Sequence, residues 1–166
     1  MIYGDCVGRW GRAFPEKEAL VDAIMNRRYT YGELSREINR MAHFLRTELD
    51  IWKGDRVACL SFNRTEYITL FLALSRLGAV LVPLNFRLAK GEFVYFLKDS
   101  TPKAIFFDQP HQEVVAGFKT DVHVPHLVCL DTDNHVGRSL QDIWDSLPYH
   151  PMDEVEIEPH DPQLII

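Results

Sequence analysis

The sequence predicts an α/β fold in which a mainly parallel sheet is covered by helices. Short apolar runs typical of buried strands alternate with helical patterns along most of the 166 residues, and this order is typical of parallel sheets with helical crossovers. Residues 54–87 give the clearest example, because they read as a strand, a helix, a glycine stop and a second strand. This βαβ unit requires a right-handed crossover.

Composition excludes several classes of protein. The chain is 46% hydrophobic and 25% charged, which is ordinary for a globular domain. Its formal charge is −6, with Lys and Arg scattered among acids, whereas nucleic-acid binding needs a concentrated basic face. The longest apolar region, 68–84, is interrupted by Arg76, Gly78 and Pro83 and is too short for a membrane span of about 20 residues. We expect no nucleic-acid partner and no transmembrane segment.

The three cysteines indicate the compartment. Cys59 and Cys129 lie in apolar runs, where we expect them to be buried, and Cys6 leaves the number odd. The cysteines have no CxxC spacing and cannot all form pairs, which favours a reducing compartment over a disulfide framework. No basic stretch followed by an apolar run opens the chain as a signal peptide would. We therefore expect a cytoplasmic protein.

The first third predicts a short helix after Asp5, strands at 19–24 and 28–30, and a long helix. Thr30 and Glu33 have the spacing of a capping box, in which each side chain satisfies the other's backbone N–H. After the cap, apolar residues recur at helical spacing and predict one buried stripe. Its members are Leu34, Ile38, Met41, Ala42, Leu45 and Leu49.

The central third predicts strands at 56–62 and 79–84 on either side of a helix. We expect Asn63 to cap that helix, with Glu66 three positions later. Gly78 follows the last helical position and suits the left-handed conformation that ends a helix.

The last third repeats the alternation, with helices at 91–98, 112–118 and 139–147 and strands at 103–107 and 126–130. Residues 148–162 are acidic and punctuated by proline, which predicts an extended surface connection. Residues 163–166 begin another apolar strand. Because a domain seldom ends on a bare apolar strand, we expect the chain to be a piece of a longer protein.

Taken in order, these segments resemble the adenylate-forming AMP-binding superfamily, and within it the acyl-CoA synthetase (fatty acid–CoA ligase) branch. The resemblance covers nearly the whole chain, and its motifs are specific through their order and spacing. It implies that 1–166 is the N-terminal portion of an AMP-binding (adenylation) domain, within the large N-terminal domain of such an enzyme. The motifs are TYGEL at 30–34, NRMAHFL at 39–45, GDRVACL at 54–60 and LGAVLVPLNFRL at 77–88.

The resemblance implies a two-step ligation that uses ATP, Mg²⁺ and coenzyme A in the full-length parent. A small carboxylic acid attacks the α-phosphorus of ATP to give an acyl-adenylate and pyrophosphate, and the thiol of coenzyme A then displaces AMP. The family's phosphate-gripping segment would follow a DPxxII-type strand, which here is DPQLII at 161–166. Neither GxxxxGK[ST] nor GxGxxG occurs in the sequence. We expect the chain to contain no catalytic residue, to be inactive alone and to hold no cofactor tightly.

Arg87 is the one candidate ligand contact. The matching position in some family members lies near the coenzyme A nucleotide, and a guanidinium fork suits phosphate. A solvated arginine paired with Glu92 or another surface acid is the more common situation and carries more weight. Asn85 is expected to stabilise the turn through its side-chain amide.

Other polar and aromatic groups give weaker signals. His123 and His126 are a close pair without further ligands nearby, so we expect an exposed loop and no metal site. Phe93, Tyr95 and Phe96 have the spacing of core residues more than of a channel. A GxSxG elbow is missing from the sequence, which gives a hydrolase triad no support.

Alternative functions stay open. Another adenylate-forming enzyme is one, such as a peptide-synthetase adenylation domain, a fatty acyl-AMP ligase or a luciferase-like oxidase. A non-catalytic α/β interaction module is another, and it would unfold cooperatively and have a closed sheet edge. A truncated domain would instead expose the edge of its last strand and favour self-association through it.

Overall fold

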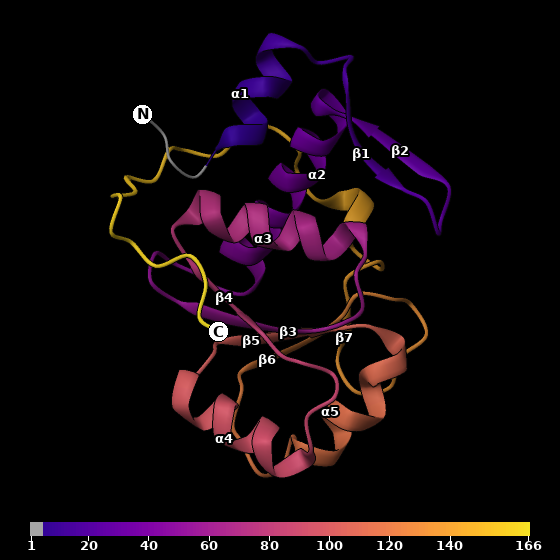
Figure 1. The fold of residues 1–166 in the computed structure, drawn as a ribbon, viewed down its shortest axis with the longest axis vertical. Coiled ribbons are helices and arrows are strands. Elements are labelled where there is room, and N and C mark those ends of the chain that lie inside the picture. The colour runs from indigo at the N-terminus through magenta and orange to yellow at the C-terminus, as the bar shows by residue number, and fades with distance from the viewer. Residues whose placement is uncertain (1–4) are drawn as a thin grey trace.

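In the computed structural model, which describes residues 5–166, a five-stranded parallel sheet lies between two layers of helices (Figure 1). The strand order is β4-β3-β5-β6-β7, and each neighbouring pair is parallel. The predicted fold class is thereby confirmed. The strands are β3 (Arg56–Leu60), β4 (Val80–Pro83), β5 (Ala104–Phe107), β6 (His126–Cys129) and β7 (Arg138–Ser139).

Both faces of the sheet are buried. Helices α2 (Tyr31–His43) and α3 (Thr65–Leu77) cover one face, and α4 (Lys90–Ser100) and α5 (Gln112–Phe118) cover the other (Figure 1). Alternate side chains of β3 enter different cores: Val57 and Cys59 join the cluster under α2 and α3, and Ala58 and Leu60 join the one under α4 and α5. Such two-sided burial explains why these strands read as continuous apolar runs.

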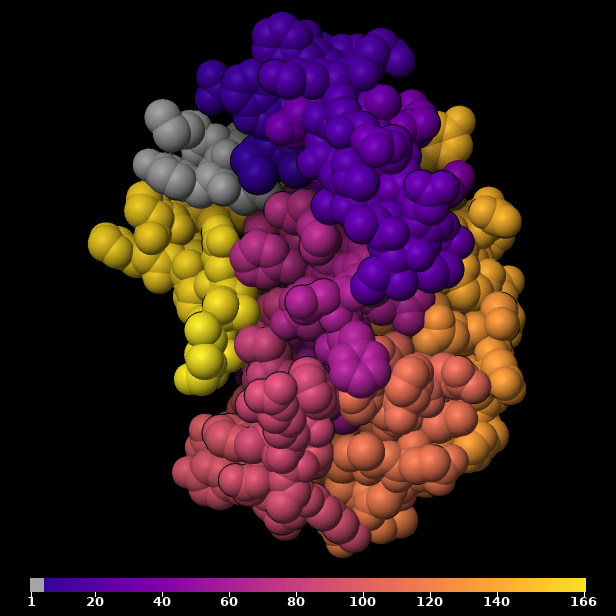
Figure 2. All heavy atoms as spheres, turned by 45° about the vertical axis from the view of Figure 1, so that its right-hand side comes forward, coloured from indigo at the N-terminus to yellow at the C-terminus, as the bar shows by residue number. Residues whose placement is uncertain are grey.

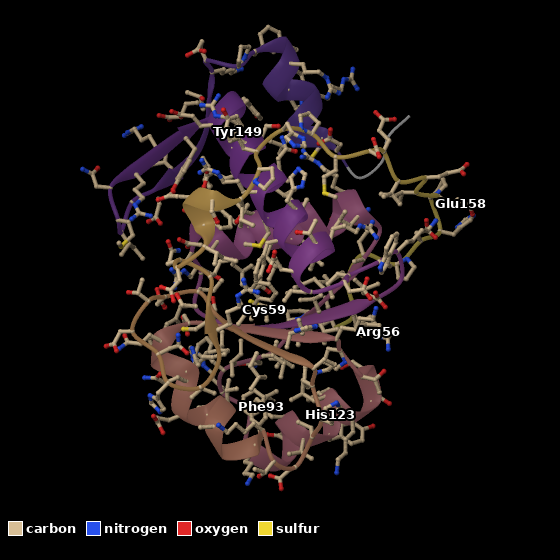
Figure 3. The ribbon with its side chains drawn as sticks, turned by 180° about the vertical axis from the view of Figure 1, so that it is seen from behind. Arg56, Cys59, Phe93, His123, Tyr149 and Glu158 are labelled. Carbon is tan, nitrogen blue, oxygen red and sulfur yellow. The ribbon has the colours of Figure 1, made fainter. Side chains whose placement is uncertain are left out.

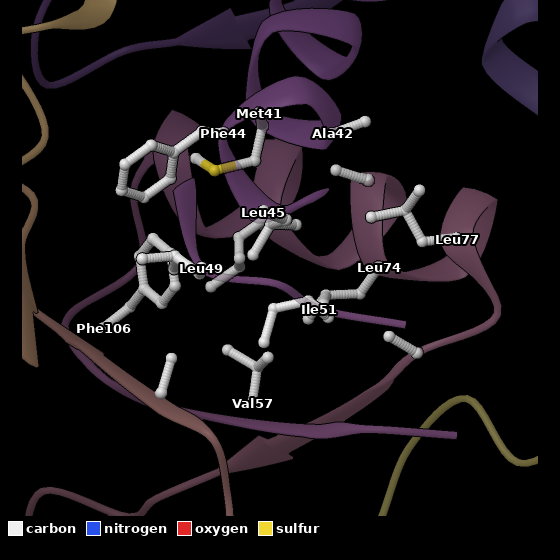
Figure 4. Close-up of a cluster of buried hydrophobic side chains, with 14 of the residues drawn as sticks. Met41, Ala42, Phe44, Leu45, Leu49, Ile51, Val57, Leu74, Leu77 and Phe106 are labelled. Atoms are coloured by element: carbon white, nitrogen blue, oxygen red, sulfur yellow. The ribbon is translucent and has the colours of Figure 1, made fainter. Parts of the chain in front are cut away.

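The larger core packs α2 onto the sheet. Phe44 and Phe106 are fully buried and meet edge to face, with ring centroids 6.1 Å apart (Figure 4). Met41, Leu45 and Val57 fill the space around them (Figure 4). The stripe predicted as far as Leu49 is confirmed, because all six of its members are buried. The last two members of the stripe, Leu45 and Leu49, lie beyond the end of α2, in and just after a π-helical stretch, Phe44–Glu48.

The N-terminal elements form a separate flank. Helix α1 (Cys6–Ala13) begins after Asp5, whose carboxylate accepts a hydrogen bond from the N–H of Gly8 at 3.0 Å. Strands β1 (Glu18–Asp22) and β2 (Arg27–Thr30) pair antiparallel outside the main sheet (Figure 1). The capping box at Thr30 and Glu33 is present with both of its hydrogen bonds.

The predicted cap at Asn63 is wrong. Helix α3 begins at Thr65, its cap position is Arg64, and the described chain supplies no side-chain cap there. Arg64 has an extended backbone, and its guanidinium is held by Glu66 and by a distant acid described below. These contacts hold Arg64 at the cap position, so the helix begins one residue later than a cap at Asn63 would place it. The predicted stop at Gly78 is confirmed, with φ of +67°.

The predicted helix at 139–147 is also wrong. Residues Arg138–Ser139 instead form the short edge strand β7, and only Trp144–Ser146 make a single 3₁₀ turn. The N–H of Leu140 donates to the carbonyl of Cys129 at 2.8 Å, so pairing with β6 takes the backbone groups that a helix would need. A short 3₁₀ turn, Gln109–His111, also precedes α5.

Residues 148–162, all of them described, contain neither helix nor strand. They run along the outside of the molecule, where Figure 2 shows the C-terminal segment in yellow. Asn39 Nδ2 donates to the carbonyl of Tyr149 at 2.8 Å, and Lys53 Nζ donates to the carbonyl of Glu156 at 2.8 Å. Beyond them, Leu164 forms a parallel bridge with Leu81 of β4.

No helix in the described part of the chain is both long enough and apolar enough to cross a membrane. All three cysteines are free, and Cys59 and Cys129 are buried as predicted. Cys59 lies within the sheet, between the two helical layers (Figure 3).

Candidate functional site at the carboxyl edge of the sheet

Loops after four neighbouring strands meet at one edge of the sheet. In open parallel sheets this carboxyl edge is where ligands bind. A hollow of about 660 Å³ opens beside it. One wall is the tip of the β1–β2 hairpin, and the other is formed by the residues that follow β3, β5 and β6. The lining includes Asp22, Ile24, Met25 and Arg27 from the hairpin and Phe62, Asn63, Arg64, Asp108, Gln109 and Asp131 from the sheet.

Arg64 ties two of these loops together. Its Nη1 donates to both carboxylate oxygens of Asp131, at 2.9 and 3.0 Å, and its Nε donates to Glu66 at 2.7 Å. Burial lowers the pKa of Arg64, but the hydrogen bonds and charges of Glu66 and Asp131 outweigh this effect and raise the pKa above its ordinary value. The guanidinium is therefore a permanent cation whose bonding capacity is largely used within the chain.

Asp108, which follows β5, ties a third loop to the one after β3. It is 3% exposed, and its Oδ2 accepts a hydrogen bond from the N–H of Phe62 at 2.9 Å. Its Oδ1 contacts Nδ1 of His111, which is 6% exposed. The sequence interpretation missed both residues. An aspartate directly after an apolar strand is the one signal that points to this position.

The ring of His111 also belongs to a cluster of three rings. Phe86 follows β4, Phe62 follows β3 and His111 follows β5, so three neighbouring strands each supply one ring. The ring centroids of Phe86 and Phe62 are 5.1 Å apart, those of Phe62 and His111 are 4.7 Å apart, and those of Phe86 and His111 are 6.0 Å apart. Phe62 and Phe86 remain 48% and 43% exposed, so the cluster borders the open edge.

Arg87 lies next to Phe86, one of the three rings. Its side chain is exposed, and the centre of its guanidinium is 5.4 Å from the centroid of the Phe86 ring. The N–H of Arg87 donates to Oδ1 of Asn85 at 3.0 Å, which confirms the turn role predicted for Asn85. Glu92, its expected partner, instead accepts from the N–H of Ala89 at 2.7 Å. Within residues 5–166 Arg87 forms no ion pair, which leaves its donors available.

The remaining candidates lie elsewhere. Phe93 is buried between the sheet and α4 (Figure 3), whereas Tyr95 and Phe96 are exposed, so the core interpretation is right for Phe93 alone. His123 is exposed in a loop, and His126 begins β6. In the part of the chain that is described, no group of three or more His, Cys, Asp or Glu side chains is placed to hold a metal ion.

The carboxyl edge does not fit a magnesium–triphosphate site. Mg²⁺ needs free carboxylate oxygens, but Asp108 and Asp131 accept hydrogen bonds from His111, Arg64 or backbone N–H groups through both oxygens. No glycine-rich phosphate loop occurs in the sequence. At the same edge, Arg87 presents an exposed guanidinium to solvent.

Comparison with known proteins agrees with this architecture. The profile of the AMP-binding enzyme family matches residues 7–166. The chain is 38% identical over 114 residues to a long-chain-fatty-acid–CoA ligase, FadD13, from Mycobacterium tuberculosis, covering 69% of this chain and 22% of that ligase. It is 42% identical over 87 residues to a feruloyl-CoA synthase from an Amycolatopsis species, covering 52% of this chain and 18% of that synthase.

Solved structures place the fold in the same group. The N-terminal domain of FACL13 from M. tuberculosis superimposes with a TM-score of 0.85 and 31% identity, covering 98% of this chain and 40% of that one. ATP-bound MatB from Rhodopseudomonas palustris superimposes with a TM-score of 0.76 and 25% identity, covering 96% of this chain and 32% of that one. The chain thus spans about a fifth of the curated relatives' length and corresponds to their N-terminal part. It belongs to the AMP-binding enzyme family, and within that family it is fatty acid–CoA ligase-like.

Proposed function

We propose that this chain is the supporting part of an ATP-dependent acyl-CoA synthetase, and that alone it forms no acyl-adenylate. The parent would convert a carboxylic acid, ATP and coenzyme A into acyl-CoA, AMP and pyrophosphate. The carboxyl edge carries the proposal: the carboxylates of Asp108 and Asp131 are hydrogen-bonded within the chain, and Arg87, next to Phe86, offers a cation that forms no ion pair within residues 5–166. Such an edge binds and orients a phosphorylated ligand but supplies no metal-assisted phosphoryl chemistry.

The names of the relatives support a carboxylate–CoA ligase. The similar proteins include a long-chain-fatty-acid–CoA ligase, a feruloyl-CoA synthase and a 4-hydroxybutyrate–CoA ligase. Their acids differ in length and in aromatic character, while the reaction type is shared. The common chemistry therefore favours coenzyme A, more than any one acid, as the ligand of this part of the fold.

ATP–pyrophosphate exchange tests the inactivity of the chain. With a panel of short, long and aromatic carboxylic acids, we expect the 166-residue chain to show no exchange above the protein-free background. We expect the full-length protein that carries this sequence to exchange with at least one acid. Exchange catalysed by the chain alone would overturn the proposal, as would a full-length protein that activates none of the acids.

We assign Arg87 the role of contacting a phosphate of coenzyme A. Arg87→Ala in the full-length protein should raise the KM for coenzyme A about tenfold, because a charge-assisted hydrogen bond contributes about 1.5–3 kcal/mol. The KM for ATP should not change. Lys90→Ala is the matched control, since Lys90 is a nearby exposed cation already paired with Asp121 at 2.8 Å. An unchanged KM for coenzyme A removes this assignment.

The runner-up function is that of a fatty acyl-AMP ligase, and it can be distinguished by following coenzyme A in reactions of the full-length protein. That enzyme would form acyl-adenylate and consume no coenzyme A. Loss of free coenzyme A thiol from the reaction mixture, followed over time, distinguishes the two, because the synthetase converts the thiol into a thioester and the acyl-AMP ligase leaves its concentration unchanged. The exposed Arg87 beside Phe86 favours the ligase that uses coenzyme A.

We also propose that the isolated chain self-associates at high concentration. Leu164 pairs with Leu81 on one side, and no described strand covers its other side. Leu164 and Ile165 are exposed, and an open apolar strand edge favours pairing between copies. Sedimentation velocity should show dimers that Leu164→Lys removes, whereas Ile24→Lys at the hairpin tip should not remove them. A chain that stays monomeric at high concentration would contradict this proposal.

A further inference from the structure

The cluster of three rings is attached to a buried acid. Asp108 and His111 are among the few buried polar residues, and they contact each other directly. Burial of an ionisable pair is costly unless both members are well satisfied. Here one oxygen of Asp108 accepts from Phe62 and the other contacts His111, so the pair joins the end of β3 to the turn after β5. Its place at the open edge calls for an explanation beyond core packing.

The pair fixes the position of an aromatic surface. The imidazole of His111 lies 4.7 Å from the Phe62 ring and 6.0 Å from the Phe86 ring, measured between centroids. Phe86 thus has two ring neighbours, and the centre of the Arg87 guanidinium lies 5.4 Å from the centroid of its ring. Aromatic pairs at such distances favour defined orientations, and an ordered ring restricts the arginine that lies over it.

We propose that Asp108 and His111 are positioning residues that hold Phe62 and Phe86 in place and thereby orient Arg87 toward a phosphorylated ligand. The inference rests on the proposed contact between Arg87 and a phosphate of coenzyme A. Asp108 and His111 themselves touch no ligand. Their contribution is pre-organisation, since an arginine already held in its binding geometry loses less conformational freedom when the ligand binds.

A double-mutant cycle in the full-length protein tests the coupling between His111 and Arg87. In titration calorimetry, Arg87→Ala should weaken coenzyme A binding by about tenfold and His111→Ala by about fivefold. The double variant should bind no more weakly than Arg87→Ala alone, because His111 acts through Arg87. Additive losses would overturn the proposal.

His111→Phe separates positioning from stability. Phenylalanine keeps a ring beside Phe62 and Phe86 and leaves the N–H of Phe62 bonded to Asp108, but removes the imidazole that contacts the other oxygen of this buried carboxylate. We expect a lower unfolding midpoint together with coenzyme A affinity within about twofold of the unmodified protein. If affinity instead falls in step with stability, the pair has a purely structural role. His123→Ala, at an exposed loop histidine, is the control and should change neither property.

Nuclear magnetic resonance makes the test independent of coenzyme A. In the 166-residue chain with labelled phenylalanine, His111→Ala should shift and broaden the ring signals of Phe86, and His123→Ala should not. Unchanged Phe86 signals overturn the positioning role. If Arg87→Ala leaves coenzyme A affinity unchanged while the Phe86 signals move, the coenzyme A assignment fails and the positioning of the rings stands.

Discussion

The guanidinium of Arg64 donates hydrogen bonds to both carboxylate oxygens of Asp131, at 2.9 and 3.0 Å. The two residues are 67 positions apart and follow β3 and β6, which are separated in the sheet by β5. The N–H of Gln109, after β5, completes the link by donating to Asp131 at 2.8 Å. The loops at the carboxyl edge are therefore held together by their own charged groups, and Arg87 is not part of this network.

Arg64→Ala should destabilise the chain by about 2 kcal/mol, because Asp131 and Glu66 each lose a charged hydrogen-bond partner while they remain partly buried. Urea unfolding followed by circular dichroism measures the change, provided that the m-value stays constant.

Arg28→Ala is the matched control for that variant. Arg28 pairs with Glu18 at 2.6 Å, but both side chains are mostly exposed, and surface pairs of this kind contribute less than about 1 kcal/mol. Equal losses for the two variants would show that the Arg64 link does not hold the edge together.

The periodicity of the sequence predicted most of the fold, because local burial patterns decide helices and buried strands. The stripe ending at Leu49 and the stop at Gly78 are examples. The misses arise where a distant partner decides. Ser139 lies in a segment with a helical pattern, but pairing with β6 makes it a strand. Arg64 displaces the expected cap because Asp131, far along the chain, holds its side chain.

The site was less predictable than the fold. Arg87 and Asn85 carried a signal because they follow a strand directly. The cluster formed by Phe62, Phe86 and His111 carried none, since it exists only through the strand order β4-β3-β5, which places three separate loops side by side. Contacts between loops depend on sheet topology, and periodicity alone does not specify that topology.

Gly78→Ala should destabilise the chain by about 1–2 kcal/mol, because φ of +67° disfavours a residue with a Cβ. The added Cβ would also lie 3.0 Å from Cγ of Lys53. Gly91→Ala is the control, since nothing lies within 4 Å of its added Cβ and it lies inside α4. Gly91→Ala should raise the free energy of unfolding by up to about 1 kcal/mol. A neutral Gly78→Ala, measured by urea midpoint, would contradict this account.

The attachment of the C-terminal segment should depend on pH. The hydrogen bond from Lys53 lowers the pKa of Asp161, and the same bond raises the pKa of Lys53. The contribution of Asp161 is present above its unfolded pKa of about 3.9 and is lost as pH falls through the lower folded value. The contribution of Lys53 is present below its unfolded pKa of about 10.4 and is lost as the pH rises through its higher folded pKa. The attachment should therefore be complete between about pH 5 and 10.

Hydrogen exchange at the amide of Ile165 measures this attachment, because that N–H donates to the carbonyl of Leu81 at 3.0 Å. Its protection factor should fall below about pH 4, and Lys53→Gln should lower the factor and remove its pH dependence. Lys90→Gln breaks a comparable surface pair elsewhere and should leave Ile165 unchanged. Protection that is constant with pH in the unmodified chain would refute the role of this ion pair.

The thiols should differ sharply in reactivity, because a thiolate must form and be reached by the reagent. Burial raises the pKa of the Cys59 thiol and that of Cys129, whereas Cys6 is exposed. With a disulfide reagent such as DTNB, one thiol of the three should react rapidly in the folded chain, and all three should react in guanidinium chloride. Cys6→Ser should remove the rapid phase. A second rapid thiol in the folded chain would mean that β3 or β6 opens to solvent, which is incompatible with a sheet buried on both faces.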